Sequence, residues 1–233
     1  MLWVIDPSLN SAEDQGTQEL LAQWSGDHRL FRPAIDANGP SVDDGYDFDA
    51  VILMGSAASV HDDYPWLKAM SDWLRPLVTG QIERPLLGIC FGHQLLAHIA
   101  GGEVQWMGAE RLKRLGVENS SLRNSRLLAV EAEELRVVVS HAEAVTTAPA
   151  GYRVTASRPG VPIDGIEHET LPLFSYQFHP EARDEFATRT GIGAEQIDAR
   201  LCRDSRRIID RFLELVSAQK KRAGRPSAGS HSG

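Results

Sequence analysis

The chain has 233 residues, 42 % of them hydrophobic, and a formal net charge of −8. This length and apolar content are enough for one large globular domain, while the negative charge argues against general nucleic-acid binding. No stretch reaches the ~18 apolar residues of a membrane-spanning helix, and the N-terminal sequence MLWVIDPSLN lacks the basic and apolar regions of a signal peptide.

The first part of the chain alternates between strand and helix patterns. The sequence predicts strands at 2–5, 29–33, 50–54 and 86–89, and helices at 12–25, 66–78 and 94–99. This alternation predicts an α/β fold, a three-layer sandwich with a central, mostly parallel sheet. Ligands of such sheets bind beyond the carboxyl ends of the strands. Gly55 and Cys90 both follow strands, and we expect them to face one site.

The second part is richer in strands and predicts a smaller antiparallel β part. The strand patterns lie at 127–130, 136–139, 152–156, 165–168 and 173–177. An amphipathic helical region follows at 183–216, with a break near Gly191 to Gly193. We expect one domain over residues 1–217 and a disordered basic tail over 218–233, because the tail lacks apolar residues.

Two cysteines occur in very different settings, which makes a disulfide framework improbable and predicts a reducing, cytoplasmic location. Cys202 stands among arginines on a predicted helix, with no neighbouring base, and we interpret it as a bystander. Cys90 stands between a predicted strand and a predicted helix, flanked by Gly88 and Gly92. This Gly-x-Cys-x-Gly pattern is the cysteine version of the nucleophile elbow. The helix N-terminus beneath it favours a thiolate.

A nucleophilic cysteine needs a base, and the late sequence Phe178-His179-Pro180-Glu181 offers one. Glu181 is close enough along the chain to orient the imidazole of His179. The predicted triad is therefore Cys90, His179 and Glu181. His141 is a rival base, but no carboxylate at short spacing orients it.

No metal and no cofactor is expected. The run from His61 to Asp63 holds three ligand-type side chains, but adjacent loop residues rarely converge on one ion, and a solvated turn is the better interpretation.

Three motifs resemble those of the class I, triad-type glutamine amidotransferases, which have a flavodoxin-like fold. They are Gly88-Ile89-Cys90-Phe91-Gly92-His93-Gln94-Leu95, Gly101-Gly102 and Gln177-Phe178-His179-Pro180-Glu181. The resemblance extends from the first strand to Glu181 and is strongest to free-standing proteins similar to the amidotransferase domain of GMP synthase. It implies that Cys90 attacks the side-chain amide of glutamine, forms a γ-glutamyl thioester, and releases ammonia and then glutamate.

The resemblance also implies further site residues. The oxyanion hole would use the backbone N–H groups of Gly55 and Phe91, although the loop at Gly55 lacks the family's usual proline. Gln94 would contact the substrate, and the segment containing Ser140 and His141 would lie near the glutamine pocket.

Two other functions are compatible with the same sequence. The same triad could hydrolyse γ-glutamyl peptides or amides, or the fold could serve as a catalytically silent regulatory or binding module. A synthetase partner acting in trans is one possible ammonia acceptor, with the basic segment 111–116 as either its contact or a charged surface hairpin. No nucleic acid and no membrane is expected as a partner.

Overall fold

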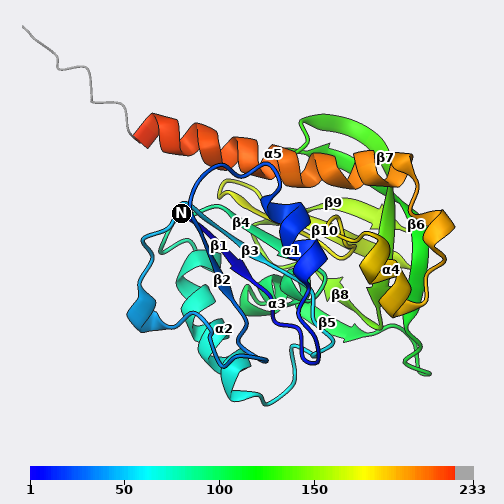
Figure 1. The fold of residues 1–233 in the computed structure, drawn as a ribbon, viewed down its shortest axis with the longest axis horizontal. Coiled ribbons are helices and arrows are strands. Elements are labelled where there is room, and N and C mark those ends of the chain that lie inside the picture. The colour runs from blue at the N-terminus through cyan, green and yellow to red at the C-terminus, as the bar shows by residue number, and fades with distance from the viewer. Residues whose placement is uncertain (224–233) are drawn as a thin grey trace, which may run out of the picture.

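The computed structural model describes residues 1–223, which form three layers with a nine-stranded sheet in the middle and helices on both of its faces (Figure 1). The first strands are β1 (Leu2–Ile5), β2 (His28–Phe31), β3 (Ala50–Leu53), β4 (Leu86–Ile89), β5 (Glu103–Trp106) and β6 (Arg114–Ser125). The later strands are β7 (Val130–His141), β8 (Glu143–Thr147), β9 (Tyr152–Arg158), β10 (Val161–His168) and β11 (Leu173–Tyr176). The helices are α1 (Asp14–Leu21), α2 (Pro65–Val78), α3 (Phe91–Ile99), α4 (Asp184–Thr190) and α5 (Ala199–Ala223), with short 3-10 turns at Val42–Asp44 and Ala194–Gln196.

The large sheet has the strand order β2-β1-β3-β4-β11-β10-β9-β6-β7. Strands β2, β1, β3, β4 and β11 run parallel, and β10, β9, β6 and β7 continue the sheet in antiparallel pairs. Strands β5 and β8 form a separate antiparallel pair. The predicted three-layer α/β architecture with a small antiparallel part is confirmed.

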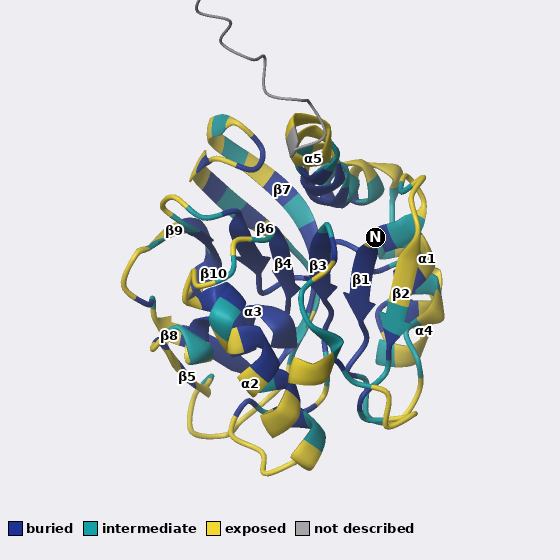
Figure 2. Cartoon of the chain, turned by 90° about the vertical axis from the view of Figure 1, so that its left-hand side faces the viewer, coloured by how far each residue is buried: buried dark blue, intermediate teal, exposed yellow. Residues whose placement is uncertain are grey.

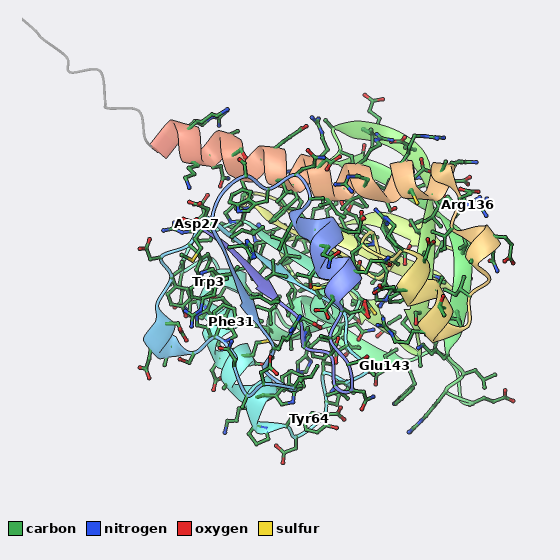
Figure 3. All side chains as sticks on the ribbon, in the orientation of Figure 1. Trp3, Asp27, Phe31, Tyr64, Arg136 and Glu143 are labelled. Atoms are coloured by element: carbon green, nitrogen blue, oxygen red, sulfur yellow. The ribbon has the colours of Figure 1, made fainter. Side chains whose placement is uncertain are left out.

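The parallel strands form because their side chains are buried on both faces. In β1, Leu2 and Val4 contact the core under α1 and α5, whereas Trp3 and Ile5 contact the core under α2 and α3. The helices cover the two faces of the sheet accordingly (Figure 2). The rings of Trp3 and Phe31, from neighbouring strands, lie 4.8 Å apart (Figure 3). Continuous apolar runs are typical of strands covered on both sides.

The strand predicted at 127–130 is wrong. Leu127, Leu128 and Ala129 belong to the turn between β6 and β7, and Ala129 has a left-handed φ of 55°. Both leucine side chains are buried in the turn, which explains why the segment looks like a strand in the sequence. Strands β5, β6 and β8 were not predicted at all.

The predicted break in the C-terminal helical region is confirmed. Helix α4 ends at Gly191, which adopts a left-handed φ of 81° as the C-cap. The predicted tail boundary, in contrast, lies too early, because α5 continues to Ala223. Residues 218–222 are good helix formers, and Lys220 donates a 2.8 Å hydrogen bond to Asp49. The rest of the predicted tail, 224–233, lies outside the described residues.

Candidate active site

The backbone of Cys90 is strained at the junction of β4 and α3. Its φ of 51° and ψ of −103° lie where residues other than glycine are rarely found. The conformation is held from both sides: the Cys90 N–H donates to the Tyr176 carbonyl at 2.8 Å, and the Cys90 carbonyl accepts the Gln94 N–H at 3.0 Å. Strain of this kind costs about 1–3 kcal/mol and is concentrated at functional sites.

The two glycines around Cys90 allow the close approach of backbone segments. A Cβ atom on Gly92 would lie 2.2 Å from the Leu53 carbonyl oxygen, and one on Gly88 would lie 2.7 Å from the Gly92 carbonyl oxygen. Both neighbours are backbone atoms that cannot turn aside. The elbow therefore needs glycine at both positions.

His179 and Glu181 form a hydrogen-bonded pair directly after β11. Glu181 Oε1 accepts a hydrogen bond from His179 Nδ1 at 2.8 Å. The backbone of His179 is fixed by its N–H, which donates to the Val138 carbonyl at 2.9 Å. Among the described residues His179 Nε2 has no hydrogen-bond partner. With Nδ1 held by the carboxylate, Nε2 is the ring nitrogen left for proton transfer.

The charges around His179 favour its protonated form. Burial alone would lower the pKa of His179, but the thiolate form of Cys90 and the Glu181 carboxylate outweigh burial and raise the pKa to about 10. His179 is therefore an imidazolium at neutral pH when Cys90 is a thiolate. Such an ion pair combines an activated nucleophile with an acid for the leaving group.

Gly55 and Phe91 both lie next to Cys90. A Cβ atom on Gly55 would lie 2.8 Å from His179 Cε1 and 3.4 Å from Cys90 Cβ, so this glycine touches both residues. Phe91 is the first residue of α3, and its N–H has no partner within the helix. Ser56 holds the Gly55 loop by donating to the Pro7 carbonyl at 2.7 Å and accepting the Ala58 N–H at 3.1 Å. Ser56 thus stabilises a loop that has no proline.

Gln94 is buried and points away from solvent into a hydrogen-bond chain. Its Nε2 donates to the Glu143 carbonyl at 2.8 Å and to Gln177 Oε1 at 3.2 Å. Gln177 Nε2 in turn donates to Cys90 Sγ at 3.7 Å. Gln177 was not predicted as a site residue, although it directly precedes Phe178-His179 and follows β11, where a ligand site is expected.

Ser140 and His141 end β7 beside the same site. Cys90 Sγ lies 3.8 Å from the Ser140 carbonyl oxygen. His141 is buried, and its Nδ1–H donates to the Glu143 carbonyl at 2.8 Å. Burial and the nearby Arg158 guanidinium lower the pKa of His141 to about 3. A histidine held neutral and bonded at Nδ1 in this way is a poor rival to His179 as the base.

A buried charged group stands behind His141. The Arg158 guanidinium donates to His141 Nε2, to Asp164 Oδ1 at 2.8 Å and to Glu118 Oε2 at 2.7 Å. Ser120 donates to the other oxygen of Asp164 at 2.6 Å. Arg158, Asp164 and Glu118 satisfy one another's charges and together hold the His141 imidazole in place. His141 in turn holds the Glu143 carbonyl through its Nδ1–H. No local sequence signal indicates this link, since its members come from four strands.

Two cavities meet at the candidate site. The smaller, of about 170 Å³, is lined by residues that include Cys90, Gln94, His141 and Glu143. The larger, of about 360 Å³, is lined by residues that include His179 and Glu181. Four residues line both cavities: Ser56, Ala57, Lys113 and Ser140. Cys90 thus borders the smaller cavity and His179 the larger one.

Other types of site find no support in residues 1–223. Within this range no three His, Cys, Asp or Glu side chains gather as metal ligands. His61 contacts the Val104 carbonyl at 2.9 Å and Asp62 accepts the Ser59 N–H at 2.8 Å, as expected for a surface turn. In the same part of the chain, no helix combines the length and the apolar character needed to cross a membrane.

Comparison with known proteins identifies relatives by sequence. Residues 31–190 match the family model described as glutamine amidotransferase class-I. A GMP synthase (glutamine-hydrolyzing) from Gibberella zeae is 32 % identical over 192 residues, which cover 77 % of this chain and 33 % of that protein. A GMP synthase (glutamine-hydrolyzing) subunit from Methanopyrus kandleri is 36 % identical over 107 residues, covering 46 % of this chain and 55 % of that protein. The chain thus spans about a third of the length of full GMP synthases such as that of Gibberella zeae.

Solved structures show the same fold. A glutamine amidotransferase from Thermotoga maritima has a TM-score of 0.73 at 15 % identity, covering 92 % of this chain and 96 % of that chain. A glutamine amidotransferase from Methylobacillus flagellatus has a TM-score of 0.71 at 17 % identity, covering 92 % of this chain and 94 % of that chain.

Proposed function

The chain belongs to the class-I glutamine amidotransferase family, and on this premise we propose that it hydrolyses the side-chain amide of glutamine at Cys90. One observation carries the proposal: the strained Cys90 lies beside His179, whose other ring nitrogen is bonded to Glu181 at 2.8 Å. A nucleophile, a proton carrier and an orienting carboxylate are the groups that acyl transfer requires. We propose that the chain as far as the end of α5 acts as one amidotransferase-like unit.

The proposed reaction begins with the attack of the Cys90 thiolate on the glutamine carbonyl carbon. The N–H groups of Gly55 and Phe91 stabilise the oxyanion of the tetrahedral intermediate. His179 Nε2 then protonates the departing nitrogen, and ammonia leaves behind a γ-glutamyl thioester. His179 next takes a proton from water, which attacks the thioester and releases glutamate and the Cys90 thiolate. Glu181 keeps the proton on Nδ1 throughout.

The smaller cavity is the proposed place for the glutamine side chain. It borders Cys90 and contains the buried amide of Gln94 and the carbonyl of Glu143. Both are polar groups fixed by hydrogen bonds before a substrate arrives, which reduces the entropic cost of orienting it. Gln94, Ser140 and His141 are thus proposed to shape the glutamine pocket.

A synthetase in a separate chain is the proposed consumer of the ammonia. The name of the relative from Methanopyrus kandleri is that of a subunit, whereas longer relatives such as that of Gibberella zeae are named as whole synthases. The proposed hydrolysis of glutamine does not depend on this partner.

The function is tested by incubating the purified chain with glutamine and measuring ammonia and glutamate. We expect both products in equal amounts, and we expect a diazoketone analogue of glutamine to label Cys90 once per chain. Labelling is read by mass spectrometry of the peptide that contains Cys90. A catalytically silent module would release no ammonia and remain unlabelled, and that pair of results would overturn the proposal.

The glutaminase rate should decline only at high pH. Because the pKa of His179 is raised to about 10, the protonated acid persists through neutral pH and is lost as the pH rises towards that value. We therefore expect kcat with saturating glutamine to stay level between pH 7 and pH 9 and to fall above it. Initial rates in buffers of constant ionic strength measure this profile. A decline centred near pH 6.5 would contradict the assigned role of His179.

Replacing Glu181 with glutamine should slow turnover much more than it weakens the binding of glutamine. Besides the Cys90 thiolate, the Glu181 carboxylate is the charge that raises the pKa of His179 against burial, and the substitution removes it while keeping the side-chain volume. We expect kcat to fall about a hundredfold, with KM changed less, and the high-pH decline to move to lower pH. Steady-state kinetics across pH measure all three quantities. A variant with the kcat and pH profile of the wild type would show that Glu181 does not act through His179.

A further inference from the structure

Arg158, the last residue of β9, is a buried arginine whose three side-chain nitrogen atoms each have a different partner. Nε donates to Asp164 at 2.8 Å, Nη1 donates to Glu118 at 2.7 Å, and Nη2 donates to His141 Nε2. The two carboxylates belong to β10 and β6, and Glu118 is itself held by Arg114 Nε at 2.5 Å. The sheet therefore fixes the direction in which the guanidinium points at His141.

The contact with Arg158 decides which nitrogen of His141 carries the proton. A guanidinium has only donors and keeps its charge, so His141 Nε2 has to accept and carries no proton. The proton of the neutral ring is then on Nδ1, which donates to the Glu143 carbonyl at 2.8 Å. The pKa of His141, lowered to about 3 by burial and by Arg158, agrees with a neutral ring. Arg158 thus holds His141 in a single tautomer.

The Glu143 carbonyl in turn orients the amide of Gln94. Glu143, labelled in Figure 3, begins β8, and its carbonyl accepts a second hydrogen bond from Gln94 Nε2 at 2.8 Å. Because a carbonyl only accepts, the nitrogen and not the oxygen of the Gln94 amide turns towards it. The other N–H of this amide donates to Gln177 at 3.2 Å. With Nε2 used twice, Oε1 remains to accept a hydrogen bond from a ligand of the smaller cavity, which Gln94 lines.

A purely structural role explains the buried ions behind His141 poorly. The side chains of Arg158 and Asp164 are both 0 % exposed. Burying such charges costs solvation free energy that apolar side chains of the same size would not cost, so a buried ion pair is weak evidence for stability. What the ions do provide is direction, because charge-assisted hydrogen bonds require a defined geometry. The group that receives this direction is the imidazole of His141.

We propose that Arg158 is a positioning residue for the binding of glutamine, and this rests on the proposed function at Cys90. Arg158 lines neither cavity and acts through His141 and the Glu143 carbonyl. When the contact with Arg158 is lost, His141 can carry its proton on Nε2. A bare Nδ1 then faces the Glu143 carbonyl oxygen, acceptor against acceptor, and the carbonyl has to move. Gln94 no longer presents its oxygen to the substrate in a fixed direction.

The first test is the turnover of glutamine by Arg158→Lys in the full chain. A lysine keeps the positive charge beside the two carboxylates, but its single nitrogen cannot replace three separate donors. We expect KM for glutamine to rise about tenfold, the effect of losing one hydrogen bond near the upper end of its usual range, with kcat within about threefold of the wild type. Thermal unfolding shows whether the variant is folded.

Arg206→Lys is the matched control for the first test. Arg206 also bridges two carboxylates, those of Glu19 on α1 and Asp210 on α5, and it lines neither cavity. We expect this variant to keep the wild-type KM and kcat.

The second test reads the tautomer of His141 by ¹⁵N NMR of the histidine rings. The signal that disappears in His141→Asn identifies His141. We expect the proton on Nδ1 in the wild type and a shift of population towards Nε2–H in Arg158→Lys. The measurement on the wild type does not depend on the folding of any variant.

The third test combines the two substitutions. An asparagine amide can donate to the Glu143 carbonyl and has no tautomers, so in the His141→Asn background Arg158→Lys should change KM by less than about twofold. A role of Arg158 in stability alone would leave its effect on KM the same in both backgrounds.

The outcomes separate this inference from the function on which it rests. Three results would refute the positioning role and leave the glutaminase intact: an unchanged KM in Arg158→Lys, an Nε2–H tautomer of His141 in the wild type, or an equal rise of KM in the His141→Asn background. A wild-type chain that releases no ammonia from glutamine contradicts the proposed function, and this inference with it.

Discussion

Replacing Cys90 with alanine is expected to lower the turnover of glutamine on the order of 10⁴-fold or more. The substitution removes the atom that forms the thioester, and no other described side chain reaches that position with a base beside it. Cys90 also makes a 3.8 Å contact with the Ser140 carbonyl and is 4 % exposed, so its side chain is held in place before substrate arrives. The ammonia released under saturating glutamine measures the effect.

The second cysteine provides the matched control. Cys202 lies half-buried on α5 and lines neither cavity of the candidate site, so Cys202→Ala should retain the wild-type turnover. Circular dichroism and the thermal midpoint should show that Cys90→Ala remains folded. If this folded variant released ammonia at the wild-type rate, another nucleophile would have to be sought and the proposed mechanism would fail.

Replacing Gly92 with alanine is expected to destabilise the fold by about 3 kcal/mol or more. The new Cβ would lie 2.2 Å from the Leu53 carbonyl oxygen, which belongs to the neighbouring strand β3. To relieve this clash, α3 has to move away from the sheet, and its buried side chains lose contacts with the core. Chemical denaturation measures the loss, and soluble yield is a second readout if the variant does not fold.

Gly101→Ala is the control that separates the steric clash at Gly92 from the backbone effect of replacing any glycine. Gly101 has a left-handed φ of 92°, and no atom lies within 4 Å of the place that a Cβ would take, so Gly101→Ala should cost only the backbone strain of about 1–2 kcal/mol. If Gly92→Ala were no more destabilised than Gly101→Ala, the close approach of α3 and β3 would not control the elbow.

Sequence reasoning succeeded where the physical signal is local. Strands such as β1 and β3 are buried on both faces and leave continuous apolar runs that identify them. Cys90 with its two glycines and the pair His179–Glu181 each lie within a few residues, so their chemistry is visible without a structure.

The features that sequence reasoning missed depend on contacts between distant segments. Strand β6 carries mostly half-exposed or polar residues because its hairpin with β7 extends to the edge of the sheet. The link between Arg158 and His141 arises from the register of β9 and β7, which are not adjacent in the sheet. Gln177 contacts Cys90 only because β11 lies beside β4.

The position of β11 has a consequence for the order of folding. This strand lies between β4 and β10, yet it comes about eighty residues after β4 in the chain, and its last residue, Tyr176, accepts the N–H of Cys90. Pairing across such a sequence separation is slow, because the loop must close before any contact rewards it. The early strands β1, β3 and β4 can assemble with the thiol still lacking its histidine. Recovery of enzymatic activity during refolding therefore reports the insertion of the central strand, not the first collapse of the chain.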